Sequence, residues 1–305
     1  MQYRIENIKD FDLDHIFDCG QCFRWERRSD GSYTGIAKGK IVNMRYEKGD
    51  FDRGAESDTI MSAAAVSGGN IENEYHSMPY GGTLIIDNCT EEDFQNIWRQ
   101  YLDLDRDYGK IKRRLSKGDP VMRRAIKNGS GIRILQQDLW ETILSFIISQ
   151  NNHIPRIKGC IEKLAELFGQ PAGTYEGRAW HDLPGPEVLA SLSEADLAEV
   201  RLGYRSKYIL GTAKAVVRDG LPQTAEQLAA LPGVGPKVAA CILLFGMAKY
   251  DAFPVDVWMA RVMHQLYGLD QKDRRAMELY ASEHFGRLGG FAQQYLFYYI
   301  RNLHD

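Results

Sequence analysis

The sequence lacks the excess of positive charge that is typical of a generally basic nucleic-acid binder. Its 305 residues include 38 Lys and Arg against 41 Asp and Glu, which gives a formal net charge of −3. Net charge describes solubility better than the chemistry of a site, so a local basic face remains compatible with DNA binding. Basic residues do cluster at 110–114, 123–124 and 201–207. We expect the first two clusters to be solvated helix faces.

Cysteines are also few, and their arrangement argues against a metal centre. The five are odd in number and mostly dispersed: Cys19, Cys22, Cys89, Cys160 and Cys241. Only the first two are spaced like metal or redox ligands, and no second pair completes a set of four. We therefore expect reduced thiols, no metal and no cofactor.

Long apolar runs and targeting signals are missing too. No apolar stretch approaches the roughly 18 residues of a membrane span, and no signal-peptide pattern precedes Asp10. We expect a monomer that does not engage a membrane. A cytoplasmic location follows, associated with the nucleoid in a prokaryote or inside the nucleus in a eukaryote.

The pattern of the chain changes near residue 105. Short alternating or β-branched runs at 32–36, 41–46 and 83–87 predict a small antiparallel β domain over residues 1–105. Within it, residues 53–82 are rich in Gly, Ser, Ala and Asn, which indicates a flexible insertion. Beyond Thr90 the spacing becomes helical, and residues 106–305 are expected to be all-α, so the fold class is α+β. Helices are predicted at about 120–127, 138–150, 154–168, 194–200, 206–218, 224–231, 236–247, 256–267, 273–285 and 290–300.

The most informative segment is 231–237, Leu-Pro-Gly-Val-Gly-Pro-Lys. Thr224 and Gln227 have the spacing of a capping box for the helix before it. The Pro-Gly-Val-Gly run ends that helix, and Pro236 suits the first position of the next one. Lys237 then lies in the first helical turn, where the positive end of the macrodipole favours the free amine that a nucleophile needs. The hairpin glycines ahead of the helix also predict an anion site.

A carboxylate follows the lysine at a distance of nineteen residues. Asp256 ends the run Phe-Pro-Val-Asp at 253–256 and precedes an apolar-periodic stretch. For this aspartate alone, a helix N-cap is the commoner role. Together with the amine of Lys237 and a phosphate cradle, it suggests covalent chemistry on nucleic acid.

These segments resemble the helix-hairpin-helix glycosylases of the Gly/Pro-Asp superfamily. In that superfamily a lysine at the position of Lys237 marks a bifunctional glycosylase/lyase, and the aspartate at the position of Asp256 is catalytic. Cys241, four residues after the lysine, is typical of the 8-oxoguanine DNA glycosylase family. The chain lacks the clustered C-terminal cysteines that hold an iron–sulfur cluster in the endonuclease III-like relatives.

Four further segments resemble that family in the expected order. Segment 20–25, Gly-Gln-Cys-Phe-Arg-Trp, is similar to its N-terminal signature, in which the carbonyl of the glycine reads the oxidised base. Segments 146–156 and 202–205 are similar to those that fill the vacated space and read the estranged cytosine. Segment 291–297 is similar to the element that grips the flipped base. The resemblance implies substrate-binding roles for Gly20, Cys241, Gln293 and Phe297, and DNA-binding roles for Asn151, Arg156, Tyr204, Arg205, Gly233 and Gly235.

The resemblance implies a DNA N-glycosylase with AP lyase activity. Its partner would be double-stranded DNA containing oxidised guanine, and excision would be preferred opposite cytosine. Lys237 would form a Schiff base with the sugar, and β-elimination would then cleave the strand.

Two other functions stay open from the sequence. A glycosylase of the same fold for another damaged purine generally lacks the hairpin lysine. A helix-hairpin-helix module that only binds DNA does not need Asp256, or the pair formed by Gln293 and Phe297.

Overall fold

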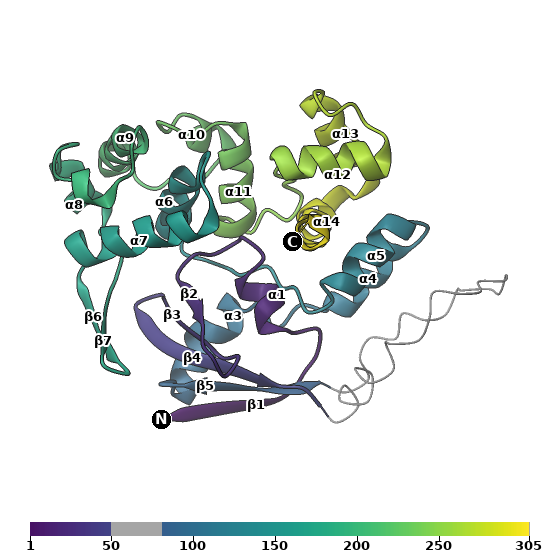
Figure 1. The fold of residues 1–305 in the computed structure, drawn as a ribbon, viewed down its shortest axis with the longest axis horizontal. Coiled ribbons are helices and arrows are strands. Elements are labelled where there is room, and N and C mark those ends of the chain that lie inside the picture. Colours follow the sequence, from purple (N-terminus) through teal and green to yellow (C-terminus); the bar gives the residue numbers. More distant parts are fainter. Residues whose placement is uncertain (50–80, 305) are drawn as a thin grey trace.

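The computed structural model describes residues 1–49 and 81–304. The predicted insertion at 53–82 therefore lies almost entirely outside the described residues. The rest of the chain forms an N-terminal sheet below a larger assembly of helices (Figure 1). The predicted fold class, an antiparallel β part followed by a helical region, is confirmed.

The sheet is antiparallel and joins strands from both sides of the undescribed segment. Its order is β1 (Gln2–Ile8), β5 (Gly82–Asp87), β4 (Lys40–Glu47), β3 (Tyr33–Ala37) and β2 (Trp25–Arg27). Lys38 and Gly39 both have positive φ between β3 and β4, as a tight hairpin turn requires. Trp25 stacks on Phe17 at 4.0 Å between ring centroids, and its indole donates to the hydroxyl of Tyr101. The sheet thus has its own apolar core.

Helices form the remainder of the structure and share one large core. Short segments lie beside the sheet, namely α1 (Leu13–Phe17), α2 (Glu91–Asp93), the π-helix Phe94–Trp98 and α3 (Arg99–Tyr101). The main series is α4 (Tyr108–Ser116), α5 (Pro120–Asn128), α6 (Leu139–Ser149), α7 (Ile154–Phe168), α8 (Pro186–Ser191), α9 (Arg205–Asp219), α10 (Ala225–Ala229), α11 (Pro236–Gly246), α12 (Val257–Tyr267), α13 (Arg274–His284) and α14 (Gly289–His304). Helix α6 packs against α7, α9 and α11, so it forms the centre of the helical region.

The structure differs from the sequence prediction within this region. A two-stranded hairpin, β6 (Pro171–Tyr175) and β7 (Arg178–His181), interrupts the helices. Trp180 of this hairpin packs against Ile36 and Ile41 of the N-terminal sheet, which is a long-range contact that local periodicity does not report. Of the helix expected at 194–200, only a 3-10 turn at Ala198–Val200 forms.

The basic cluster at 110–114 is also only partly a solvated face. Lys112 is buried, because its amine donates to the carboxylate of Asp10 and to the carbonyl of Ser130. The interpretation of that cluster as wholly solvated was therefore wrong at Lys112. The charge pairs with a residue a hundred positions earlier, which sequence spacing does not reveal.

All five cysteines are buried free thiols. In residues 1–49 and 81–304 no group of three or more His, Cys, Asp or Glu side chains is placed to hold a metal ion. Within the same ranges no helix combines the length and the apolar character needed to cross a membrane.

Candidate active site

The hairpin before α11 has the local structure that the sequence predicts. The side chain of Thr224 accepts from the backbone of Gln227, and the two residues form a capping box at α10. Gly233 has a φ of +79°, and a Cβ there would lie 2.5 Å from the ring of Tyr208, so only glycine fits. Pro236 is the first residue of α11, with Gly235 as N-cap. Lys237 accordingly lies in the first turn of α11.

Asp256 is the N-cap of α12, the commoner role that the sequence predicts for this aspartate alone. Its Oδ1 accepts a hydrogen bond of 2.8 Å from the backbone N–H of Met259. This bond fixes the carboxylate at the start of the helix. Oδ2 takes no hydrogen bond within the described parts of the chain, and Asp256 lines the same cavity as Lys237. The capping role therefore leaves one carboxylate oxygen available for chemistry.

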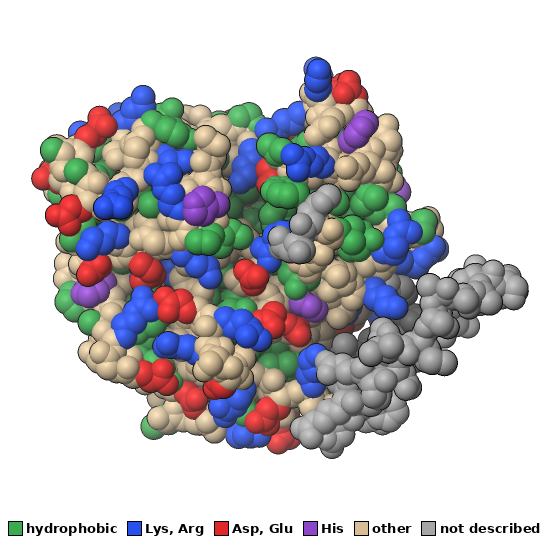
Figure 2. Space-filling model, viewed as in Figure 1, with side chains coloured by type: hydrophobic (Ala, Val, Ile, Leu, Met, Phe, Trp, Pro, Cys, Tyr) green, Lys and Arg blue, Asp and Glu red, His purple; other side chains and the backbone are tan. Residues whose placement is uncertain are grey.

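One cavity brings together every residue predicted to be catalytic or substrate-binding. Its volume is about 40 Å³, and it is enclosed by α11, α14, the start of α12 and the loop after α1. Figure 2 shows the surface hollowed between α11 and α12, with hydrophobic side chains in the hollow. The lining includes Lys237, Asp256, Gly20, Cys241, Gln293 and Phe297, which come from parts of the chain as much as 277 positions apart.

Two features of this cavity are suited to a planar, polar ligand. Gln293 is 6% exposed, and its amide oxygen has no hydrogen-bond partner within residues 1–49 and 81–304. A buried acceptor without a donor is destabilising, and such groups are concentrated at functional sites. Phe297 lies one helical turn further along α14, and its ring edge is 3.3 Å from where a Cβ on Gly20 would be. The ring therefore closes the cavity over the glycine.

The thiol of Cys241 shares this wall. Burial raises the pKa of Cys241 above its ordinary value, although the nearby amine of Lys237 acts in the opposite direction. The thiol is therefore neutral at physiological pH. The amine of Lys237 also lies 5.5 Å from the centre of the Phe146 ring. The nucleophile candidate thus faces a compact, mostly apolar chamber.

A second group of predicted residues lies at the junction of α6, α7 and α9. Asn151 is exposed and has a φ of +46°, and Tyr204 is 45% exposed. The hydroxyl of Tyr204 donates to the carbonyl of Gln150 at 3.3 Å. Arg205 is buried, and its guanidinium donates to the carbonyls of Gln150, Asn151 and Leu202. The predicted DNA contacts are therefore neighbours, but the donors of Arg205 are bound within the protein.

Comparison with known proteins places this geometry in a family. Residues 4–143 match the 8-oxoguanine DNA glycosylase N-terminal domain, and residues 144–286 match the HhH-GPD superfamily base excision DNA repair protein. The N-glycosylase/DNA lyase OGG1 of Arabidopsis thaliana is 30% identical over 303 residues, covering 92% of this chain and 75% of that protein. The chain belongs to the 8-oxoguanine DNA glycosylase family. It is a DNA N-glycosylase with DNA lyase activity.

Solved structures of relatives share the whole fold. The apo form of the Clostridium acetobutylicum 8-oxoguanine glycosylase/lyase is 39% identical, with 98% of this chain and 96% of that chain covered and a TM-score of 0.83. Its complex with double-stranded DNA containing cytosine opposite 8-oxoG gives 38% identity, coverage of 100% and 96%, and a TM-score of 0.85. MBOgg1 bound to a low-affinity DNA ligand is 41% identical, with the same coverage and TM-score. Family membership excludes the module that only binds DNA.

The sequence did not single out the residues that hold Gly20 in place in this glycosylase. The side chain of Gln21 donates to the carbonyls of Ile16 and Arg133 and accepts from the N–H of Leu135. The backbone carbonyl of Gln21 accepts from Gln137 at 2.7 Å. The loop is thereby held against residues 133–137 of the helical region directly after the glycine. Gln21 lies in the family signature at 20–25, and its place in that signature was the only feature of the sequence that pointed to its importance.

Proposed function

We propose that this glycosylase excises 8-oxoguanine from duplex DNA, preferentially opposite cytosine, and acts as a monomer. The observation that carries the proposal is the single cavity shared by an amine, a carboxylate, a glycine loop and an unpaired buried amide oxygen. The amine and carboxylate support base release through a lysine, and the other groups support recognition of a purine.

Recognition of the base follows from the donors and acceptors in the cavity. The unpaired oxygen of Gln293 is suited to an N–H on the Watson–Crick edge, and the ring of Phe297 offers a stacking face. The carbonyl of Gly20 would accept the hydrogen that N7 carries only in the oxidised purine, because N7 of guanine is an acceptor. A cavity of about 40 Å³ holds little more than one water, so the base must displace the ring of Phe297 from Gly20.

The chemistry begins once the nucleotide has left the duplex, a step that costs a few kcal/mol. The amine of Lys237 forms a bond to C1′ as the N-glycosidic bond breaks, and the electron pair leaves with the base. Asp256 stabilises the positive charge that develops on the sugar and deprotonates the amine. Opening of the sugar gives a Schiff base. Loss of a proton from C2′ then expels the 3′ phosphate, and water releases the lysine.

Preference for cytosine opposite the lesion is assigned to the second group of residues. Tyr204 is exposed and would fill the vacated space, while Asn151, Arg156 and Arg205 would offer donors to the estranged base. Acceptors left unpaired on that base would cost about 1–3 kcal/mol. In the free protein Arg205 donates to backbone carbonyls, so contact with cytosine requires a rearrangement of the loop at 150–152.

The experiment that tests the proposal is borohydride trapping on a duplex with 8-oxoguanine opposite cytosine. The wild-type protein should give a covalent adduct together with the excised base. Lys237→Gln should bind the same duplex but give no adduct.

Substrate preference is checked in parallel with adenine opposite the lesion and with a duplex containing an alkylated purine. Excision without an adduct would contradict the role of Lys237. Faster excision of the alkylated base would favour the glycosylase of the same fold for another damaged purine.

A further inference from the structure

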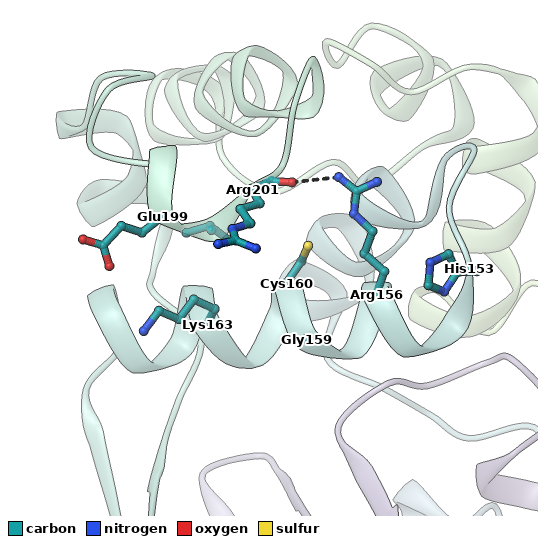
Figure 3. A pocket seen from close by; sticks show the side chains of 8 residues that line it. His153, Arg156, Gly159, Cys160, Lys163, Glu199 and Arg201 are labelled. Carbon is teal, nitrogen blue, oxygen red and sulfur yellow. Dashed lines mark hydrogen bonds between the residues drawn. The ribbon is translucent and has the colours of Figure 1, made fainter.

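A groove separate from the active-site cavity lies between α7 and the 3-10 turn at Ala198–Val200. Its volume is about 860 Å³ (Figure 3). The lining consists of His153, Arg156, Gly159, Cys160, Lys163, Glu199, Val200 and Arg201. A Cβ added at Gly159 would meet nothing within 4 Å, so the floor of the groove is open. The groove is large enough for a segment of a polymer.

Two guanidinium groups in this groove have no carboxylate partner among the residues that the structure describes. Neither Arg156 nor Arg201 is within 4.0 Å of an acidic side chain in residues 1–49 and 81–304, whereas Arg24 and Arg178 in the same range each pair with a glutamate. Figure 3 shows the two groups on either side of the sulfur of Cys160. At the far end, Lys163 pairs with Glu166, and Glu199 points away from the guanidiniums. The positive charge is therefore concentrated at the end near Arg156.

The backbone of Arg201 is held in an unfavourable conformation. Its φ of +59° lies in the left-handed region, which glycine or asparagine usually occupies. The guanidinium of Arg156 donates to the Arg201 carbonyl at 3.1 Å and so fixes this peptide. Strain of this kind persists where the surroundings impose it, most often at functional sites. A long cation is thus kept where a glycine would be easier to accommodate.

The charged end of the groove is continuous with the proposed contacts to the opposite strand. Arg201 precedes Tyr204 by three residues, and His153 follows Asn151 by two. We propose that the groove binds the sugar–phosphate backbone of the strand opposite the lesion, with Arg201 donating to one phosphate. This inference rests on the proposed function, because it needs the estranged base at Asn151 and Tyr204. Arginine is suited to the role, since its planar fork matches phosphate.

The test uses Arg201→Gly, because glycine adopts the observed φ freely and the fold should be retained. Affinity for a duplex with 8-oxoguanine opposite cytosine is measured at about 50–200 mM salt, the range in which phosphate contacts change affinity most. Loss of one phosphate contact should flatten the log–log salt dependence by about 0.9 and weaken binding about 3–10-fold at the lower salt concentration. Arg4→Ala removes one charge from the distant strand β1 and should change neither quantity.

The strand is identified with duplexes that carry a single uncharged methylphosphonate. At the contacted phosphate of the opposite strand, the replacement should weaken the wild-type protein but not Arg201→Gly. An unchanged salt dependence in Arg201→Gly, or a sensitive phosphate on the lesion strand instead, would overturn the proposal. Borohydride trapping by the wild-type protein separates this proposal from the proposed function. If the proposed function is wrong, no adduct forms; if only the phosphate contact of Arg201 is wrong, the adduct still forms.

Discussion

At the scale of single residues, the side chain of Asp256 both caps a helix and lines the active-site cavity. Oδ1 caps α12 through the N–H of Met259, and Asp256 lines the cavity that contains Lys237. Ordinary truncation to alanine would remove both at once. Asparagine is as good an N-cap as aspartate but has no charge, so it separates the two.

We therefore expect Asp256→Asn to keep the stability and lesion affinity of the wild type while losing most turnover. Asp256→Ala should lose the turnover and, in addition, about 0.5–2 kcal/mol of unfolding free energy, because the cap is gone. Urea unfolding and single-turnover excision measure the two effects. Wild-type turnover in Asp256→Asn would contradict the catalytic role of the carboxylate.

The same scale explains why Gln293 is informative. Its oxygen is buried and has no hydrogen-bond partner among the residues that the structure describes, so the free protein carries a free-energy cost there that a bound base would relieve. Most buried polar groups in this glycosylase are satisfied, as the three hydrogen bonds of the Gln21 side chain illustrate. The two buried glutamines therefore differ: the Gln21 side chain is fully engaged in holding a loop, whereas the Gln293 oxygen is available for the proposed contact with the base.

At the scale of elements, helix α6 carries an unusual carboxyl group at its N-terminal end. Glu141 is partly buried there, and burial raises its pKa from 4.5 to about 7, with Asp138 and Glu162 adding to the effect and Arg24 opposing it. A folded-state pKa above the unfolded value means that the folded protein binds the proton more tightly. The resulting stability is present in full below about pH 4.5 and is lost as the pH rises through about 7.

Glu141→Gln should consequently stabilise the glycosylase at alkaline pH and have little effect in acid. One pKa unit corresponds to about 1.4 kcal/mol, so we expect a gain of roughly 2–3 kcal/mol at about pH 8 that disappears towards about pH 4.5. Thermal unfolding of the wild type and of Glu141→Gln across this pH range measures the gain in stability. A stability difference between the two proteins that does not change with pH would contradict the raised pKa of Glu141.

At the scale of the whole molecule, the active-site cavity exists only because two parts of the chain are locked together. Gly20 belongs to the N-terminal part, whereas Lys237, Asp256 and Gln293 belong to the helical region. Arg133, which is 4% exposed, donates to the carbonyls of Lys9, Asp10 and Asp103. Its guanidinium also lies 4.6 Å from the centre of the Tyr108 ring. Arg133 therefore links the helical region to the N-terminal part through three hydrogen bonds.

Arg133→Met should lower the unfolding free energy by about 2–4 kcal/mol, because three buried carbonyls lose a charged donor. Recognition of the base should suffer more than lyase activity at a preformed abasic site, since only recognition needs Gly20 opposite α14. Denaturant unfolding and the ratio of the two activities measure these effects. Arg4→Met, which breaks an exposed pair, is the control, and equal stabilities of the two variants would contradict the role of Arg133.

The sequence by itself determined the features of this protein that depend only on neighbouring residues. The capping box at Thr224, the proline that starts α11 and the cap at Asp256 depend on neighbouring residues, so they were predicted correctly. The strands at 33–37, 40–47 and 82–87 and most of the long helices have clear periodicity for the same reason. The roles proposed for Gln293 and Gly20 came from the family resemblance, because no local pattern indicates them.

Only the tertiary structure decided which of these residues meet. The hairpin β6–β7, the burial of Lys112 and the loop tied down by Gln21 all depend on partners far away in the sequence. The same holds for the cavity, whose lining residues come from both ends of the chain, and for the groove at Arg156 and Arg201. Sequence periodicity reports the environment of a helix or strand, whereas a site is made by packing between elements, and that packing is specified by contacts with no fixed spacing.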